Sequence, residues 1–409
     1  MTAVIHPGDA LSRRQRLVYV LVLGALTALG PFSIDLYLPS LPNVQTDFDA
    51  STAAVQLTVG ATTIGFALGQ LVVGPWSDKV GRRLPLIIAT AVHVLASLAI
   101  ALSPNIELLI VFRVLQGFGA AAGGVVASAT VRDLFGGYPL VRMLSRLSLV
   151  SGVAPVIAPL AGSALLLIMP WRGMFDILAV YGLIVLVLSA VFIVETLPPE
   201  RRHLSGHSTT RQRYHALFSD RLFVGIAIVG GMVFSGLFSY LSSSPFLFQD
   251  HYHFDPQQYG LLFAINSIGI IVGVQSSSRL ARRIGPQWIL AIATAGMLVL
   301  ALVIVLLDLA GAGLWGVLVP LWLFIALCGF SFPCVQVIGL AHHGKEAGTA
   351  ASVLGAANFG LAGILSPLIG LFGTSTPIPM AVMMFGTALV AILALWLLVR
   401  PRTVPALTP

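Results

Sequence analysis

Two ionisable residues, Asp35 and Arg113, lie within long apolar segments of the sequence. A charge in such a segment is costly to place in a bilayer, so these residues are candidates for a function in a protein interior or a water-filled cavity. Asp35 could bind and release a proton as its surroundings alternate between dry and wet, with Arg113 as its electrostatic partner. The alternatives are a structural carboxylate at a helix end for Asp35 and a structural interhelix donor for Arg113.

Other polar and aromatic residues of the apolar segments could line a cavity for an amphipathic molecule. Gln116 lies one helical turn from Arg113 and could extend a polar chain, and Tyr259, Phe263 and Asn266 recur at helical spacing. The predicted cavity residues are Gln116, Phe234, Phe238, Tyr240, Tyr259, Phe263, Asn266 and Asn358. Packing between helices or against lipid remains the alternative for each of them. His93 stands alone in its segment, and we interpret it as a packing residue.

The elements that carry these residues are predicted to be transmembrane helices. With 57% hydrophobic and 9% charged residues, the chain of 409 residues has more apolar surface than a soluble protein could bury. A helix needs about 20 apolar residues to cross a bilayer. Such segments fall near residues 17–40, 52–75, 85–103, 107–129, 146–168, 173–194, 222–246, 257–277, 286–307, 314–340, 349–373 and 380–399. We therefore predict an all-α membrane protein with twelve spans and no separate soluble domain.

The basic residues predict how the chain is oriented. An even number of spans places both ends on one side, and of the 22 Lys and Arg residues all but Arg113 and Arg172 fall on that side. By the positive-inside rule, both termini and the central loop are cytoplasmic. Scattered basic residues of this kind do not predict a nucleic-acid partner. Cys328 and Cys334 form no disulfide or metal pattern, and we expect neither a metal nor a cofactor.

A long polar stretch near the middle of the chain predicts two halves. We divide the sequence into an N-terminal six-helix half at 1–195, a cytoplasmic linker at 196–220 and a C-terminal six-helix half at 221–409. The charged segment Ser77–Arg83 recurs in similar form as Ser277–Arg283, which indicates an internal duplication. Duplicated halves with a substrate site between them are a recurrent architecture of transporters.

The loop between the second and third spans carries the most specific motif. Its sequence is Gly-Pro-Trp-Ser-Asp-Lys-Val-Gly-Arg-Arg, with Gly74, Asp78, Gly81, Arg82 and Arg83 at the defining positions. At these positions the chain resembles the major facilitator superfamily, which implies the fold of that family with two pseudo-symmetric halves. Together with Arg132 and Asp133 after the fourth span, the loop is interpreted as a cytoplasmic latch that favours one conformer.

Two further motifs resemble drug:proton antiporters of this superfamily. Arg113, Gln116 and Gly117 match the R-x-x-Q-G element of the fourth span. The fifth span carries a motif for close helix packing at Gly152, Pro155, Pro159 and Gly162. It departs from the family pattern at Ala158 and Ser163, where glycine is expected. The departure is mild because both residues are small.

The string from Ser33 to Pro42, Ser-Ile-Asp-Leu-Tyr-Leu-Pro-Ser-Leu-Pro, is similar to the Bcr/CflA group of bacterial drug exporters. Ser244 and Pro245 late in the seventh span fit the same group. The resemblance implies export of phenicols, bicyclomycin or other amphipathic drugs in exchange for protons. We expect the protein to be a monomer in the bacterial inner membrane. Its partners would be drug molecules, protons and membrane lipid.

Two other functions are considered beside drug export. A transporter of a sugar or organic acid on the same fold would bind its substrate without conferring broad drug resistance. A membrane enzyme is disfavoured because the sequence has no paired-carboxylate, metal-ligand or nucleophile-base constellation. The sequence also lacks the G-x-x-x-x-G-K-[ST] loop that would cradle the phosphates of ATP.

Overall fold

The computed structural model describes residues 7–199, 210–341, 343 and 347–404. Within these ranges every regular element is helical, and twelve helices are long and apolar enough to cross a membrane. The predicted all-α fold with twelve spans is therefore confirmed. Large apolar side chains such as Leu95, Ile292 and Leu21 are exposed on the outside of the bundle, as expected for a surface that faces lipid.

The first six spans form one half of the molecule. Its helices are α1 Arg13–Asp35, α2 Leu41–Phe48, α3 Thr52–Val80, α4 Arg83–Ala101, α5 Ile106–Leu134, α6 Gly137–Leu165 and α7 Trp171–Phe192. The short 3-10 turn η2, Leu38–Ser40, joins α1 to α2, and together they make a single span. Pro39 lies within this turn and Pro42 in the first turn of α2, and neither has a backbone N–H to donate, which accounts for the break just after Asp35.

The last six spans form the other half. Its helices are α10 Arg221–Phe246, α11 Pro256–Ile284, α12 Pro286–Leu309, α13 Gly313–Leu340, α14 Ala347–Leu365 and α15 Ile378–Ala394. A π-helical turn, η3 Leu247–His251, extends α10, and a 3-10 segment, η5 Ser366–Phe372, extends α14. The short helix α9, Thr210–Ser219, precedes this half. The predicted boundaries at 195 and 221 remain a prediction, and residues 200–209 of the predicted linker lie outside the described residues.

Helix starts follow local signals in the sequence. Ser51 caps α3, Asn105 caps α5, and each side chain accepts a hydrogen bond from a backbone N–H in the first turn. Asp255 and Gln258 form a reciprocal capping box at the start of α11. These caps satisfy donors that would otherwise be unpaired at the end of a membrane helix.

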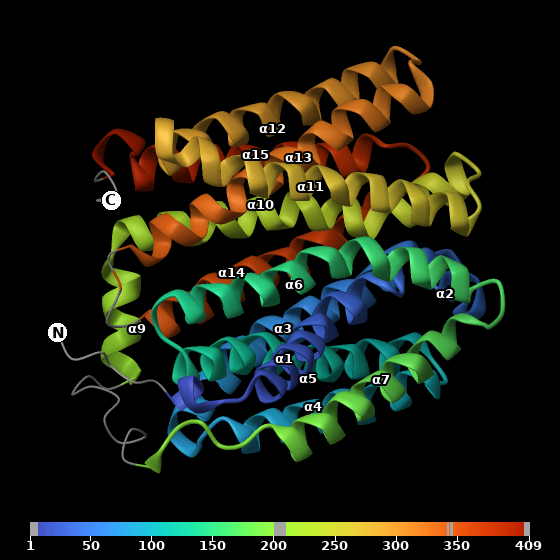
Figure 1. The fold of residues 1–409 in the computed structure, drawn as a ribbon. Helices are drawn as coiled ribbons and strands as arrows, with labels where there is room; N and C mark the ends of the chain where they lie inside the picture. The colour runs from blue at the N-terminus through green and yellow to red at the C-terminus, as the bar shows by residue number, and fades with distance from the viewer. Residues whose placement is uncertain (1–6, 200–209, 342, 344–346, 405–409) are drawn as a thin grey trace.

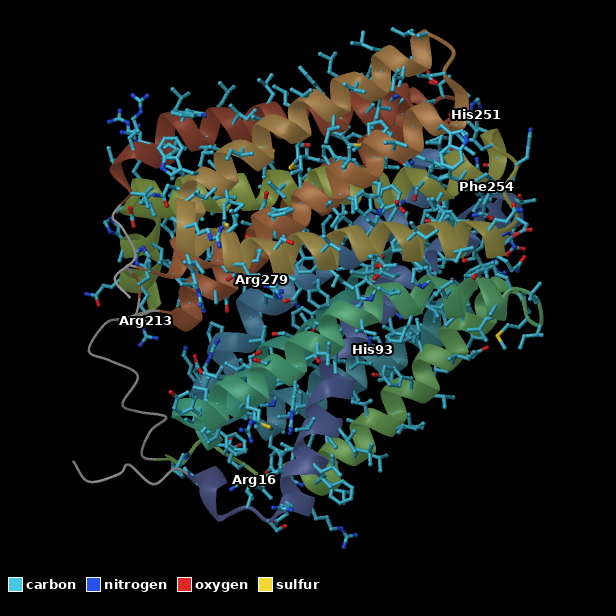
Figure 2. All side chains as sticks on the ribbon, turned by 45° about the horizontal axis from the view of Figure 1, so that its top comes forward. Arg16, His93, Arg213, His251, Phe254 and Arg279 are labelled. Atoms are coloured by element: carbon cyan, nitrogen blue, oxygen red, sulfur yellow. The ribbon has the colours of Figure 1, made fainter. Side chains whose placement is uncertain are left out.

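The helices run roughly side by side, and the two halves meet along two helix pairs (Figure 1). α3 packs against α14, and α6 packs against α11. The two described chain ends and α9 lie at one end of the bundle, which we call the α9 end; α2 lies at the opposite end, the α2 end (Figure 1). Figure 2 shows Arg213 and Arg279 toward the α9 end and His251 and Phe254 toward the α2 end.

Candidate functional site

A cavity of about 630 Å³ lies between the two halves. Helices α3 and α5 line it from one half, and α10, α13 and α14 line it from the other. Its lining includes Asp78, Arg82 and Asp133, which places one end of the cavity at the α9 end of the bundle. The cavity can therefore hold a small molecule that touches both halves at once.

Aromatic rings form the wall of the cavity away from these charges. Phe234, Phe332 and Phe359 line it, and the Phe234 ring centroid lies 4.9 Å from that of Phe359 and 5.5 Å from that of Phe332. Phe66 of the other half, which does not line the cavity, packs against Phe359 with ring centroids 4.7 Å apart. Of these rings the sequence analysis named only Phe234. Phe332 and Phe359 were missed because their spans carry many apolar residues without a distinguishing pattern.

Asn358 supplies a polar group beside this wall. Its Oδ1 is buried and has no hydrogen-bond partner among the described residues. A Cβ atom on Gly230 would stand 2.8 Å from this oxygen, so glycine at that position leaves room for the amide. Gln70 and Gln336 line the same cavity. An unpaired buried acceptor of this kind suits a ligand that donates a hydrogen bond.

Of the eight predicted cavity residues, Phe234 and Asn358 line the cavity in this conformation. Phe238 stacks behind Phe234 with ring centroids 5.2 Å apart. The remaining predicted residues are buried away from the cavity lining, and they are Gln116, Tyr240, Tyr259, Phe263 and Asn266. The structure therefore gathers two of the predicted residues at the cavity and places the others in separate polar and aromatic clusters.

Asp35 is the last residue of α1 and is only 5% exposed. The chain continues through η2 into α2, so the residue is not at the exposed end of its span. Its carboxyl group makes no hydrogen bond and no ion pair with any described residue, and it does not line the cavity. The η2 turn that follows it contacts α10 and α11 of the other half.

Arg113 is fully buried and bonds mainly to backbone oxygens. Its Nη1 donates to the Ser33 carbonyl at 2.7 Å and to Gln116 Oε1 at 2.8 Å, and its Nε donates to the Thr58 carbonyl at 3.3 Å. The guanidinium carbon lies 4.8 Å from the centroid of the Tyr37 ring. No ion pair with Asp35 forms among the described residues. Arg113 thus ties α5 to α1 and α3, and its part in proton transfer remains a prediction.

His93 lies inside the half formed by α1 to α7 (Figure 2). Its Nδ1 is 3.3 Å from the carbonyl oxygen of Gln116, and glycines at 119 and 182 pack closely against its side chain. The residue does not line the cavity. Its Nε2 is buried and has no hydrogen-bond partner among the described residues, and the packing interpretation remains a prediction.

Arg82 is the centre of the predicted latch. Its Nε donates to Asp133 Oδ2 at 2.8 Å, and its Nη1 donates to Asp78 Oδ1 at 2.5 Å and to Ser77 Oγ at 2.9 Å. Burial alone would lower the pKa of Arg82, but the hydrogen bonds and charges of Asp133 and Asp78 outweigh burial and raise that pKa above its usual value. The cluster thus joins the end of α3 to the end of α5.

The sequence analysis missed Glu195, which completes this cluster. Its Oε1 accepts a hydrogen bond from the backbone N–H of Arg82 at 2.9 Å, and its Oε2 accepts one from that of Arg83 at 3.3 Å. A carboxylate at these amides favours the start of α4 because the N-terminal end of a helix is electropositive. Gly81 adopts a φ of 106°, which explains the glycine in this turn. Arg132 lines the nearby end of the cavity.

Replacing Arg82 by alanine is expected to slow transport on the order of tenfold, because Asp78 and Asp133 would lose their shared partner and the ends of α3 and α5 would separate. The initial rate of transport in vesicles measures the effect, and substrate affinity should change less than the rate. Arg83→Ala is the matched control, since its exposed side chain donates only to the Ala190 carbonyl among the interactions described. Equal losses in both variants would contradict the role of Arg82.

The glycine and proline motif of α6 faces both α1 and α11. A Cβ atom on Gly162 would lie 2.0 Å from the Leu36 carbonyl oxygen, whereas one on Gly152 would meet nothing within 4 Å. The Pro155 carbonyl accepts a hydrogen bond from Ser267 of α11 at 3.4 Å. Pro159 is buried, and its carbonyl oxygen would lie 3.2 Å from a Cβ on Gly260. Three of the four motif residues therefore take part in close contacts.

The described residues contain no group of three or more His, Cys, Asp or Glu side chains that could hold a metal ion. Cys328 and Cys334 are both free and buried. The side chains that line the cavity offer aromatic and amide groups to a ligand.

The comparisons with known proteins agree with this geometry. An uncharacterised MFS-type transporter of Bacillus subtilis, YdgK, is 37% identical over 391 residues, which cover 95% of this chain and 97% of that protein. A bicyclomycin resistance protein homologue of Haemophilus influenzae is 27% identical over 94% of this chain and 97% of its own. Multidrug resistance proteins named MdtL are similar as well, and the one of Vibrio parahaemolyticus is 28% identical over 87% of this chain and 89% of its own.

Solved structures and a family match also indicate a membrane transporter fold. The xylose transporter XylE from E. coli, in a partially occluded inward-open conformation, superposes with a TM-score of 0.74 at 14% identity, covering 95% of this chain and 98% of its own. Residues 23–367 match the Major Facilitator Superfamily. Such proteins are multi-pass membrane transporters with small-molecule substrates, and the bacterial multidrug relatives bear out the predicted branch. This chain belongs to the major facilitator superfamily.

Proposed function

We propose that the protein exports small amphipathic drugs across the bacterial inner membrane in exchange for protons. The observation that carries the proposal is the cavity shared by both halves, which combines an aromatic wall with an unpaired buried amide oxygen. The printed names of the Haemophilus and Vibrio relatives, which refer to bicyclomycin and multidrug resistance, support the same substrate class.

The cavity favours neutral substrates over cations. The acids in its lining are Asp78 and Asp133, and both are bonded to Arg82. The aromatic wall and Asn358 therefore meet the ligand without a free carboxylate beside them. A neutral molecule with an aromatic or apolar body and a hydroxyl or amide donor, such as a phenicol or bicyclomycin, suits this lining.

Alternating access would move the substrate through this cavity. With both termini in the cytoplasm, the cavity belongs to the cytoplasmic side, and the α2 end is the outer side. There Gln249 donates to the Pro39 carbonyl at 3.0 Å, and Gln56 donates to Ser243 Oγ at 3.4 Å, so the halves are joined. Export would require these contacts to break while the latch end closes.

Asp35 would carry the proton in this cycle. It is the buried carboxyl group without a described partner, and it lies at the outer contact between the halves. Such a group is neutral while dry and ionises when water reaches it, so a change of access loads and unloads a proton. The latch residues would set the rate of the change of access, and the protein would act as a monomer.

A proton-flux assay with the purified protein in reconstituted vesicles tests the proposal. Chloramphenicol, bicyclomycin and a lipophilic cation are added in turn, and movement of protons across the membrane is recorded with a pH-sensitive dye. We expect proton movement that depends on the neutral drugs. Drug movement without any proton movement would instead identify a facilitator and reject the antiport.

Asn358→Leu is expected to raise the KM for a neutral drug about tenfold, because the substrate donor would lose its acceptor in the cavity. The maximal rate should change less, since leucine keeps the branched shape of asparagine and its number of side-chain heavy atoms. Transport rates over a range of chloramphenicol concentrations measure the effect. Gln275→Leu is the matched control, because Gln275 is exposed on α11 outside the cavity. An unchanged KM in Asn358→Leu would place the drug elsewhere.

A further inference from the structure

Gln70 of α3 lines the cavity from the half opposite to Asn358. Its amide group lies on Gly355 of α14, where a Cβ atom would overlap the amide oxygen and would also stand 2.8 Å from the amide carbon. The glycine therefore leaves the space that the glutamine occupies. Because α3 and α14 belong to different halves and pack together, this amide reaches across the contact between the halves.

Asn358 lies one helical turn further along α14, three residues after Gly355. Residues at this spacing are neighbours on one helix face, with Cβ atoms about 5–6 Å apart. Both residues line the cavity. Among the described residues, neither the Gln70 amide nor the Asn358 oxygen has a hydrogen-bond partner. Two amides from opposite halves are thus available about one turn apart.

The cavity has other uncharged polar side chains, and they are Ser77, Ser128, Gln336, Thr349 and Ser352. Ser77 already accepts a hydrogen bond from Arg82 at 2.9 Å. Gln336 is the third amide of the lining, but its side chain is exposed, whereas Gln70 is half-buried against Gly355. A side chain that is already held in place loses less conformational freedom when a ligand binds. Gln70 is therefore the better partner for Asn358.

We propose that Asn358 and Gln70 together bind a neutral substrate that carries an aromatic ring and two nearby hydroxyl groups, an arylpropanediol. The ring lies on the aromatic wall, the hydroxyl next to the ring meets Asn358 beside that wall, and the terminal hydroxyl meets Gln70 one turn away. Each amide can accept and donate, as a hydroxyl group can. Gln70 is then a specificity residue for the terminal hydroxyl. The inference rests on the proposed function, because it takes the cavity as the substrate site.

Two phenicols that differ at one group test this role. Thiamphenicol carries both hydroxyl groups, and florfenicol has fluorine, which cannot donate a hydrogen bond, in place of the terminal hydroxyl. Wild type should bind thiamphenicol about tenfold more tightly than florfenicol. Gln70→Leu should weaken thiamphenicol binding about tenfold and leave florfenicol binding nearly unchanged, so the preference disappears. Isothermal titration calorimetry on the purified full-length protein in detergent measures both affinities without any proton movement.

Gly355→Ala tests the same role without removing the glutamine. Its methyl group would take the place of the Gln70 amide, so this variant should also lose the preference for thiamphenicol. Gly360→Ala is the matched control on the same helix, because its Cβ would make only an ordinary contact of 3.6 Å with Ala67, outside the cavity lining. We expect it to keep the preference. Florfenicol binding that persists in each variant shows that the variant is folded.

A preference that persists in both Gln70→Leu and Gly355→Ala overturns the role of Gln70. Weaker binding of both drugs by Asn358→Leu would in that case still leave the cavity as the substrate site. If Asn358→Leu also leaves both affinities unchanged, the cavity is rejected as the substrate site as well. Loss of the preference in Gln336→Leu alone would assign the terminal hydroxyl to that amide and overturn the inference.

Discussion

Asp35→Asn is expected to abolish drug-dependent proton movement in reconstituted vesicles. Asparagine has nearly the same shape as aspartate, so the closed outer contact around this buried position should be kept. The amide cannot release a proton, and the cycle loses its coupled ion. The signal from the pH-sensitive dye should fall to that of vesicles without protein. This is a loss of at least roughly a hundredfold in the rate of proton movement, which corresponds to a transport barrier raised by about 3 kcal/mol.

Binding separates this loss from misfolding. The variant should still bind chloramphenicol in detergent, because Asp35 does not line the cavity. Asp47→Asn is the matched control: this second carboxylate of the same span accepts a hydrogen bond from Trp171 at 3.2 Å and pairs with Arg172 at the α2 end. We expect that variant to lose some stability but to keep coupling. Persistent drug-driven proton movement in Asp35→Asn would demote Asp35 to a structural role.

The architecture could be predicted from sequence because the bilayer constrains it strongly. Length and hydropathy define a membrane helix, and local caps such as Ser51 and Asn105 define where helices begin. The latch motif could also be identified from the sequence, since Gly81 and Arg82 are adjacent in one turn. Both the twelve helices and the family were therefore confirmed.

The partners of the buried charges could not be predicted in the same way. Asp35 and Arg113 were expected to interact, yet Arg113 bonds to the carbonyls of Ser33 and Thr58. Backbone oxygens become acceptors only through the close packing of three helices, which no spacing in the sequence reveals. Glu195 was missed for a related reason, because it lies 113 residues after Arg82 in the sequence.

The cavity was the least predictable part of the site. Phe234 and Asn358 were named, but the sequence pattern could not distinguish rings that face the cavity from rings that pack behind it. Phe238 is four residues from Phe234 on the same helix face, and it lies behind the wall because Phe359 of α14 covers it. The rotation of α10 relative to α14 decides this difference, and it depends on contacts across the whole half.

Gly162→Ala is expected to reduce stability and transport more than an alanine at the other glycine of the α6 motif, Gly152. The new Cβ would stand 2.0 Å from the Leu36 carbonyl oxygen, far inside van der Waals contact, and the obstacle is backbone that cannot rotate away. Overpacking of this kind costs about 1–3 kcal/mol or more. Leu36 directly follows Asp35, so α6 would also displace the proposed proton carrier, Asp35.

Gly152→Ala is the matched control within the same helix, because its Cβ would meet nothing within 4 Å. Alanine has the higher helix propensity, so this variant should keep or raise stability by roughly 0.5–1 kcal/mol. Thermal unfolding in detergent and drug-dependent proton movement in vesicles measure both variants. Equal behaviour of the two would show that α6 is not held against the Asp35 segment, since only that contact distinguishes two glycines ten residues apart in one motif.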